Sequence, residues 1–323
     1  MVRAGIIVRN FIMAFAALSG ALFYHSAWGE TELRIGYQKS STLLTILKLQ
    51  GSLEKAFAEQ GVKVSWYEFS SGLPLLESLN IGNVDVSADV ADTVPVFAQA
   101  AGASLTYFAR EEPSPDAQSI LVPASSPLKS LADLKGKRIA VTKAAGSHYL
   151  LIAALAKAGM TFNDITPSYL TPADGRAAFE RGNVDAWVTW EPFVASARRQ
   201  QNARVLSSGR DLAEYQRYYL ASTAFAEKHP QILALIYQQL EQTGLWVKAH
   251  PAEAARLLGP LWGNLDHSTV EQANASRSYR IRPVSRDGLG EQQKIADAFF
   301  DAGLLPKRID AGAVAIWQPP AQP

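Results

Sequence analysis

The side chains able to do chemistry in this sequence are hydroxyls, amides, carboxylates and one well-placed histidine, and their spacing matches no catalytic motif. The five histidines stand at positions 25, 148, 229, 250 and 267, without the spacing of metal ligands. The absence of cysteine excludes thiol catalysis, iron–sulfur clusters and disulfides. The glycine patterns of nucleotide-binding loops and serine hydrolases are also absent. The sequence therefore favours a binding protein, with no catalytic residue, no metal and no cofactor expected.

Residues 136–159 hold the strongest candidate for ligand chemistry, an anion-binding corner. Residues 138–142 predict a short buried strand, residues 143–146 a tight turn, and Ser147 the cap of a helix with apolar side chains at helical spacing. A helix that starts just past the carboxyl end of a strand presents free backbone N–H groups and a positive dipole end. Gly146, Ser147 and His148 are therefore candidates to contact an anion, although any α/β protein has such corners, Ser147 could act as a cap alone, and His148 could be a partly exposed histidine of the helix start.

The same order of elements occurs twice along the chain. A strand, a helix, a strand and a short helix lead to the tetrapeptide Gly-Asn-Val-Asp at residues 82–85 and again at residues 182–185, and a further strand follows each copy. Alternating strands and helices are typical of mostly parallel sheets flanked by helices. The sequence thus predicts an α/β protein of two lobes. Lobe one takes residues 30–118 and 221–323, lobe two takes residues 119–220, and the two crossings between them form a hinge.

Strand ends supply the rest of the candidate site. Ligands of such sheets bind beyond the carboxyl ends of the strands, so two facing lobes place both sets of strand ends in one cleft. The candidate ligand-binding residues are Gln38, Ser40, Ser41, Gly72, Asp89, Asp92 and Thr93 in lobe one, Gly146, Ser147, His148, Trp190 and Glu191 in lobe two, and Tyr218 on the return crossing. Residues 38–41 could instead form an ordinary polar turn, and Trp190 could pack in the core rather than cover a ligand.

Two carboxylates, Asp89 and Asp92, stand in a predicted polar loop at residues 89–93, after a third strand at residues 84–88. Uncompensated acids oppose an anionic ligand, because like charges repel strongly in a cleft of low dielectric. Either these side chains cap the following helix or point away, or one of them meets a cationic group on a zwitterionic ligand.

The first 29 residues read as a cleavable export signal. Arg3 and Arg9 precede a mostly apolar stretch at residues 11–24, and small residues at positions 27 and 29 fit a cleavage site after Gly29. We therefore expect a periplasmic protein. The length of 323 residues suits one large or two medium domains, and the net charge of +1 gives no electrostatic reason to expect nucleic acid as a partner.

The chain resembles the periplasmic substrate-binding proteins of ABC importers for aliphatic sulfonates, close to the taurine- and nitrate-binding proteins. The matching stretches are RIGYQKSS (34–41), PVFAQAAGA (95–103), SPLKSLADLKGKRIAV (126–141), GSHYLL (146–151), YLTPADGRAAFERGNVDAW (169–187), WEP (190–192) and IWQP (316–319). The resemblance spans residues 33–319. It implies a two-lobed periplasmic binding protein fold of type II that closes on a sulfonate and presents it to a membrane permease, driven by an ATPase subunit. We expect the protein to act as a monomer.

Other ligands and one other class of function stay open. The ligand of a two-lobed binding protein of this kind could also be taurine, nitrate or a thiamine-precursor pyrimidine. An exported enzyme on the same fold is the rival of a different class, with an acid/base pair drawn from Asp89, Asp92, Asp174 and Glu191. One departure bears on the choice. Proteins of the resembled family often carry a small Gly/Ser-rich loop after the third strand, where this chain has the two carboxylates.

Overall fold

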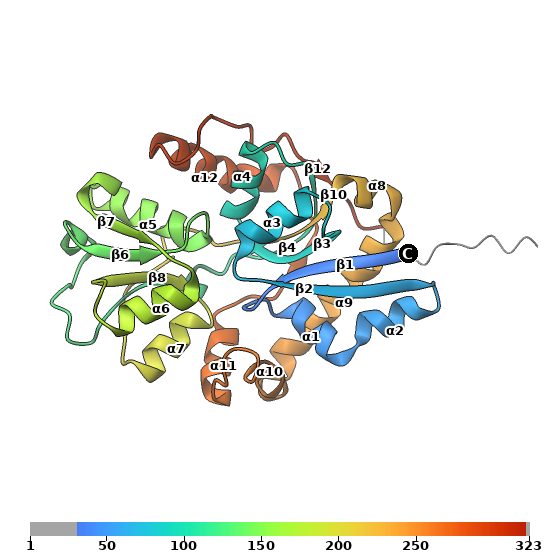
Figure 1. The fold of residues 1–323 in the computed structure, drawn as a ribbon, viewed down its shortest axis with the longest axis horizontal. Coiled ribbons are helices and arrows are strands. Elements are labelled where there is room, and N and C mark those ends of the chain that lie inside the picture. Colours follow the sequence, from blue (N-terminus) through green and yellow to red (C-terminus); the bar gives the residue numbers. More distant parts are fainter. Residues whose placement is uncertain (1–30, 321–323) are drawn as a thin grey trace, which may run out of the picture.

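The computed structural model describes residues 31–320, which form two α/β lobes joined by two crossings (Figure 1). The first lobe is built on the strands β1 (Thr31–Gln38), β2 (Val62–Phe69), β3 (Val86–Ala91), β4 (Leu105–Glu111), β10 (Arg217–Ser222), β11 (Ile281–Arg282) and β12 (Ala315–Ile316). Its helices are α1 (Leu43–Gln50), α2 (Ser52–Ala58), α3 (Gly72–Asn80), α4 (Thr93–Ala100), α8 (Thr223–Lys228), α9 (Pro230–Ala249), α10 (Pro251–Leu258), α11 (His267–Ala275) and α12 (Gly290–Asp301).

The second lobe is smaller and is formed by the middle of the chain. Its strands are β5 (Gln118–Val122), β6 (Arg138–Val141), β7 (Thr166–Tyr169), β8 (Ala186–Trp190) and β9 (Arg204–Ser208), and its helices are α5 (Gly146–Lys157), α6 (Pro172–Glu180) and α7 (Phe193–Gln200). Residues 112–117 lead into this lobe and residues 209–216 lead back out of it. The connections thus make the second lobe an insertion in the first.

Both sheets share one strand order, which confirms the predicted repeat. The first sheet runs β4-β10-β3-β1-β2 and the second runs β9-β5-β8-β6-β7. In each sheet the three strands of the repeat are parallel. The fourth strand, β10 or β5, is antiparallel and follows directly after a crossing. Each lobe is therefore completed by a strand that the chain adds just after crossing from the other lobe.

The repeated tetrapeptide has a structural role that explains its recurrence. Asp85 accepts hydrogen bonds from the backbone N–H of Arg34 at 2.8 Å and from its guanidinium at 2.7 and 3.0 Å. Asp185 binds Arg138 in the same way, at 2.8 Å from the backbone and at 2.9 and 3.2 Å from the guanidinium. The preceding glycines, at positions 82 and 182, have φ of 78° and 69°, which other residues adopt at a cost. In each lobe the motif ties the segment after a short helix to the first strand of the repeat, β1 or β6.

Several predicted elements need correction. The sequence predicts one helix over residues 43–60, whereas the structure has two, because Gly51 takes a left-handed conformation with φ of 62°. The strand β3 continues to Ala91, so the predicted polar loop at residues 89–93 is mostly strand. The sequence pattern also missed β4 and β9.

The predicted boundary between residues 220 and 221 falls inside β10. This strand lies wholly in the first sheet, between β3 and β4. The predicted export signal at residues 1–29 lies outside the described residues. Within residues 31–320, none of the helices combines the length and the apolar character needed to cross a bilayer.

Candidate ligand-binding site

A cavity of about 410 Å³ opens between the two lobes. Its first-lobe wall comes from residues 39–40 after β1, residues 68–70 at the end of β2, and residues 262–263 between α10 and α11. Its second-lobe wall comes from residues 171–176 at the start of α6 and residues 192–193 at the start of α7. Some of the strand ends predicted to face each other thus meet here, those that follow β1, β2, β7 and β8.

The walls of this cavity combine rings with polar groups. Phe69, Phe193 and Trp262 supply aromatic surface, and Ser40 supplies a hydroxyl. Arg176 also lines the cavity, with its Nε donating to Glu180 Oε1 at 2.8 Å and one terminal nitrogen donating to Gln200 Oε1 at 2.8 Å. Such a cavity can cover an organic group with rings while hydroxyls, a guanidinium and helix starts face an anionic end.

Trp190 is a direct contact between the lobes. It ends β8, is 4% exposed, and its indole N–H donates to Ser40 Oγ of the first lobe at 3.2 Å. Its ring meets that of Phe193 edge-on, with 5.7 Å between centroids. The candidate residues Trp190 and Ser40 are therefore brought together, at the margin of the cavity.

Glu191, the next residue, is also buried. Its carboxylate accepts a hydrogen bond from the backbone N–H of Ala195 at 2.9 Å, inside the first turn of α7. Burial raises the pKa of Glu191 to about 7, against the opposing effect of that hydrogen bond. The carboxylate thus serves the start of the helix, although the sequence suggested it as a ligand contact.

The helix of the predicted anion corner begins two residues earlier than expected. The helix α5 starts at Gly146 with Ala145 as its cap residue, so Ser147 is not the cap. The Ser147 hydroxyl is fully buried and has no hydrogen-bond partner. Gly146 lies against Tyr215 and Ala91 of the opposite side, so this helix start does face the first lobe.

His148 does not line the cavity. It is 1% exposed, and its Nδ1 accepts a hydrogen bond from the backbone N–H of Ala144 at 3.2 Å. Its ring meets Phe162, Tyr169 and Phe299 edge-on, with centroids 5.3, 5.4 and 5.0 Å away. Burial, aided by Lys143, lowers the pKa of His148 to about 3. The structure thus gives this residue a packing role in place of the ligand contact expected from its position.

Asp89 is not available to a ligand amine. Its side chain is completely buried, and Oδ2 pairs with Arg217 Nη1 at 2.5 Å and with Arg277 Nη2 at 3.1 Å. Arg277 also pairs with Glu111 at 2.6 Å, so two arginines balance two acids. Asp89 therefore neither caps the following helix nor is free to meet a zwitterion, and its side chain points away from the cavity, as the first reading also allowed. We refer to Asp89, Glu111, Arg217 and Arg277 as the buried ion-pair network.

Asp92 does cap the following helix, as one reading expected. It accepts from the backbone N–H of Thr93 at 3.1 Å and from that of Gln216 at 2.9 Å. Burial raises the pKa of Asp92 to about 7. Thr93 is the first residue of α4 and is buried, and Tyr218 donates its hydroxyl proton to Gln216 Oε1 at 3.2 Å. These residues join β3 to the return crossing and do not line the cavity.

The remaining first-lobe candidates also bond within their own lobe. Gln38 donates from Nε2 to the backbone oxygen of Asp89 at 2.8 Å, and its backbone N–H donates to Ser41 Oγ at 3.2 Å. Gly72 leaves no room for a side chain, since a Cβ there would lie 2.8 Å from Val94. Of the thirteen candidates, Ser40 alone appears in the cavity wall, with Trp190 and Gly146 at the facing surfaces.

Sequence reasoning missed several residues of this region. Arg217 and Arg277 gave no signal because an isolated arginine looks like a surface residue until its acidic partners are known. Trp262, Phe193 and Arg176 stand in ordinary loops and helix starts, so nothing in their spacing marked them. Within residues 31–320 there is no group of three or more His, Asp or Glu side chains placed to hold a metal ion.

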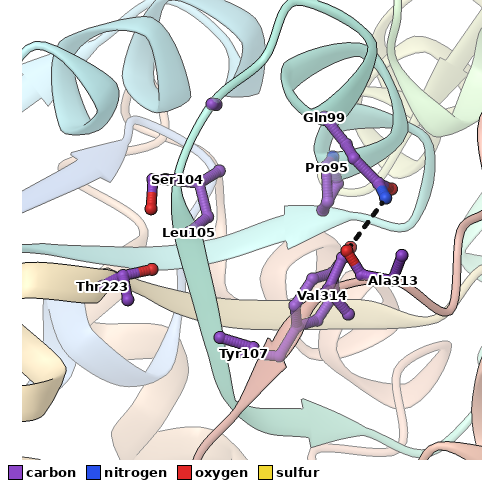
Figure 2. A pocket seen from close by; sticks show the side chains of 10 residues that line it. Pro95, Gln99, Ser104, Leu105, Tyr107, Thr223, Ala313 and Val314 are labelled. Atoms are coloured by element: carbon purple, nitrogen blue, oxygen red, sulfur yellow. Dashed lines mark hydrogen bonds between the residues drawn. The ribbon is translucent and has the colours of Figure 1, made fainter.

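A second, smaller cavity of about 200 Å³ lies within the first lobe (Figure 2). It sits between α4, β4 and the C-terminal segment, where Gln99 donates to the backbone oxygen of Ala313 at 3.4 Å. The strand β12 pairs with β4 beside it. This cavity marks where the C-terminal segment is fastened to the first lobe and shares no residue with the interlobe cavity.

Comparison with known proteins connects this geometry to a family. A family model described as NMT1/THI5 like matches residues 56–254. A relative from Escherichia coli (strain K12), named for binding aliphatic sulfonates, is 40% identical over 315 residues, covering 97% of this chain and 98% of the relative. Within the NMT1/THI5-like proteins, this chain belongs to the aliphatic sulfonate-binding family.

Solved structures of this family share the architecture. The crystal structure of the periplasmic aliphatic sulphonate binding protein SsuA from Escherichia coli matches with a TM-score of 0.80 at 39% identity, covering 90% of this chain and 94% of that one. SsuA from Xanthomonas axonopodis pv. citri, bound to MOPS, matches with a TM-score of 0.83 at 39% identity, covering 89% and 98%. The predicted two-lobed periplasmic binding protein fold is thereby confirmed, and these family members are binding proteins.

Proposed function

We propose that this protein is the periplasmic solute-binding component of an ABC importer and that it holds an aliphatic sulfonate in the interlobe cavity. The observation that carries the proposal is the cavity itself, which is walled by strand ends and helix starts of both lobes in a chain of the sulfonate-binding family. The ligand's organic part packs on Phe69, Phe193 and Trp262. Its anionic head faces the hydroxyls and helix starts at the cavity wall.

Transport requires partners that this chain does not supply. In this proposal residues 1–29 direct export to the periplasm, and the mature monomer delivers its ligand to a permease and an ATPase subunit of the inner membrane. Closure takes place about the crossings at residues 112–117 and 209–216. A ligand that contacts both lobes favours the closed state because it binds that state more tightly.

Binding should follow the chain length of the sulfonate. Affinity measured by calorimetry for C2, C4 and C6 alkanesulfonates should rise about four-fold per methylene, since burying a CH₂ contributes about 0.8 kcal/mol. Phe193→Ala removes one apolar wall and should flatten that dependence. Leu245→Ala, at a residue of α9 that is 68% exposed, is the matched control and should behave like the parent.

The same panel tests the substrate class. Mass spectrometry should recover every sulfonate unchanged. Stabilisation against heat by nitrate or an aminopyrimidine, with none by any sulfonate, would overturn the proposal, and so would turnover of the ligand.

Charge is distributed unevenly between the lobes in a way that suits an anionic ligand. Residues 118–208 contain 11 Lys and Arg against 6 Asp and Glu, whereas residues 31–117 and 209–320 together contain 18 against 23. The second lobe is therefore the basic half and attracts an anion first.

This uneven charge predicts a salt-dependent association rate. Raising the ionic strength from about 0.01 to 0.15 M shortens the Debye length from about 30 to 8 Å, so the rate constant for association of hexanesulfonate should fall several-fold. The dissociation rate should change much less, because contacts inside the closed cavity are less screened. Stopped-flow tryptophan fluorescence measures both rates. An association rate that does not vary with salt would contradict this role of the second lobe.

A further inference from the structure

The start of α5 in the second lobe packs against the end of β3 and the return crossing so closely that Gly146 has no room for a side chain. A Cβ built on Gly146 would lie 2.4 and 2.6 Å from two ring carbons of Tyr215, and 3.1 Å from the Cβ of Ala91. Real Cβ atoms essentially never approach other heavy atoms to less than 3.0 Å. Gly146 belongs to the second lobe, Ala91 ends β3 of the first lobe, and Tyr215 lies on the return crossing.

Tyr215 is held firmly where Gly146 meets it. It is 2% exposed, and its hydroxyl accepts a hydrogen bond from Arg217 Nη2 at 2.6 Å. The same guanidinium lies 5.0 Å from the centre of the Tyr215 ring and pairs with Asp89 at 2.5 Å. Next to it, Gln216 and Asp92 exchange hydrogen bonds of 2.9 and 3.0 Å. The ring of Tyr215 is therefore a fixed surface of the first lobe, although the residue belongs to a crossing.

This surface is connected to the first-lobe side of the ligand cavity. Asp89 also pairs with Arg277, which donates to Thr42 Oγ1 at 3.1 Å at the start of α1. The backbone oxygen of Asp89 accepts from Gln38 Nε2 at 2.8 Å. Ser40 thus lies between Gln38, which binds Asp89 directly, and Thr42, which is joined to Asp89 through Arg277.

We propose that the ring of Tyr215, positioned by Arg217, limits how far the start of α5 can approach when the lobes close. We call this contact surface the seat. Tyr215 and Arg217 are positioning residues in this proposal. They set the distance between the two walls of the cavity and need not touch the ligand. The proposal rests on the proposed function, because it assumes that a ligand is held by closure of the lobes.

Gly146→Ala tests the seat with the smallest possible change. Alanine fits the helix start of α5, but its methyl group meets a ring that cannot move aside, so full closure is opposed. Hexanesulfonate should dissociate about ten-fold faster, with an association rate within about two-fold of the parent. Gly290→Ala is the matched control. Gly290 is the first residue of α12, as Gly146 is of α5, and a Cβ there meets nothing within 4 Å. This control should bind like the parent.

Tyr215→Phe is the second variant, and it keeps the ring while it removes the hydroxyl that Arg217 holds. It should also speed dissociation, by a smaller factor. Thermal melting confirms that each variant is folded. If the parent binds sulfonates and Gly146→Ala binds with unchanged rates, the seat is wrong while the proposed function stands.

Lobe separation can be measured directly, because the chain contains no cysteine. Spin labels on K63C and K157C report on the first and second lobes, from exposed positions on β2 and α5. With saturating hexanesulfonate, the Gly146→Ala protein should keep a population at longer distance than the parent. If no sulfonate binds, the proposed function fails. The ligand-free distance distributions of the parent and Gly146→Ala proteins then decide on the seat, and identical distributions would overturn it.

Discussion

Replacing Arg277 with methionine should lower the free energy of unfolding by about 3–5 kcal/mol. Arg277 is 2% exposed and pairs with both Glu111 and Asp89, at 2.6 and 3.1 Å. Methionine fills much of the space of the arginine stem but leaves Glu111 buried without a cationic partner. An uncompensated buried charge costs far more than the pair contributed when intact, which is why this substitution should be severe.

Urea unfolding followed by circular dichroism measures this loss. The matched control is Arg308→Met, which removes an exposed arginine that pairs with Asp297 and Asp301 at 3.3 and 2.7 Å. Exposed ion pairs contribute about 0–1 kcal/mol, so the control should unfold close to the parent. Equal losses for the two variants would show that the buried ion-pair network does not act as the structure indicates.

The second large effect concerns acid stability and His148. In the folded protein burial depresses its pKa from 6.5 to about 3, so the folded state keeps a neutral ring while the unfolded state takes up a proton below pH 6.5. The stability contributed by the neutral ring is complete above pH 6.5 and is lost as the pH falls towards 3. Between pH 7 and pH 4 the loss should be about 3 kcal/mol, at 1.36 kcal/mol per unit.

His148→Phe should remove that part of the pH dependence. A phenyl ring suits a site among Phe162, Tyr169 and Phe299, although it cannot accept the hydrogen bond from Ala144. We expect the variant to have a lower free energy of unfolding than the parent at pH 7. Between pH 7 and pH 4 the difference between the two proteins should shift by about 3 kcal/mol in favour of the variant. Urea unfolding at each pH measures this. His267→Gln, at the exposed start of α11, should follow the parent curve. Parallel curves for the parent and His148→Phe would contradict the burial argument.

The sequence by itself determined the class of fold and its internal repeat. Strand and helix periodicity are local properties. The Gly-Asn-Val-Asp motif recurs because each copy makes the same connection within its own repeat, Asp85 to Arg34 and Asp185 to Arg138. The sequence also predicts helices at about residues 230–249 and 251–258, each opened by a proline, and the structure has both with these bounds. The resemblance of its motifs also led to the correct family.

Only the tertiary structure decided what the individual polar residues do. From the sequence, Asp89 is an uncompensated acid that would oppose an anionic ligand. Its partners, Arg217 and Arg277, lie 128 and 188 residues further along the chain, so no local pattern reveals them. His148 and Ser147 stand at a helix start, but the side that each presents depends on packing against elements distant in sequence. The cavity likewise takes one wall from each lobe and a tryptophan from a late loop. Contacts of this kind depend on how the lobes meet, which no local pattern of residues encodes.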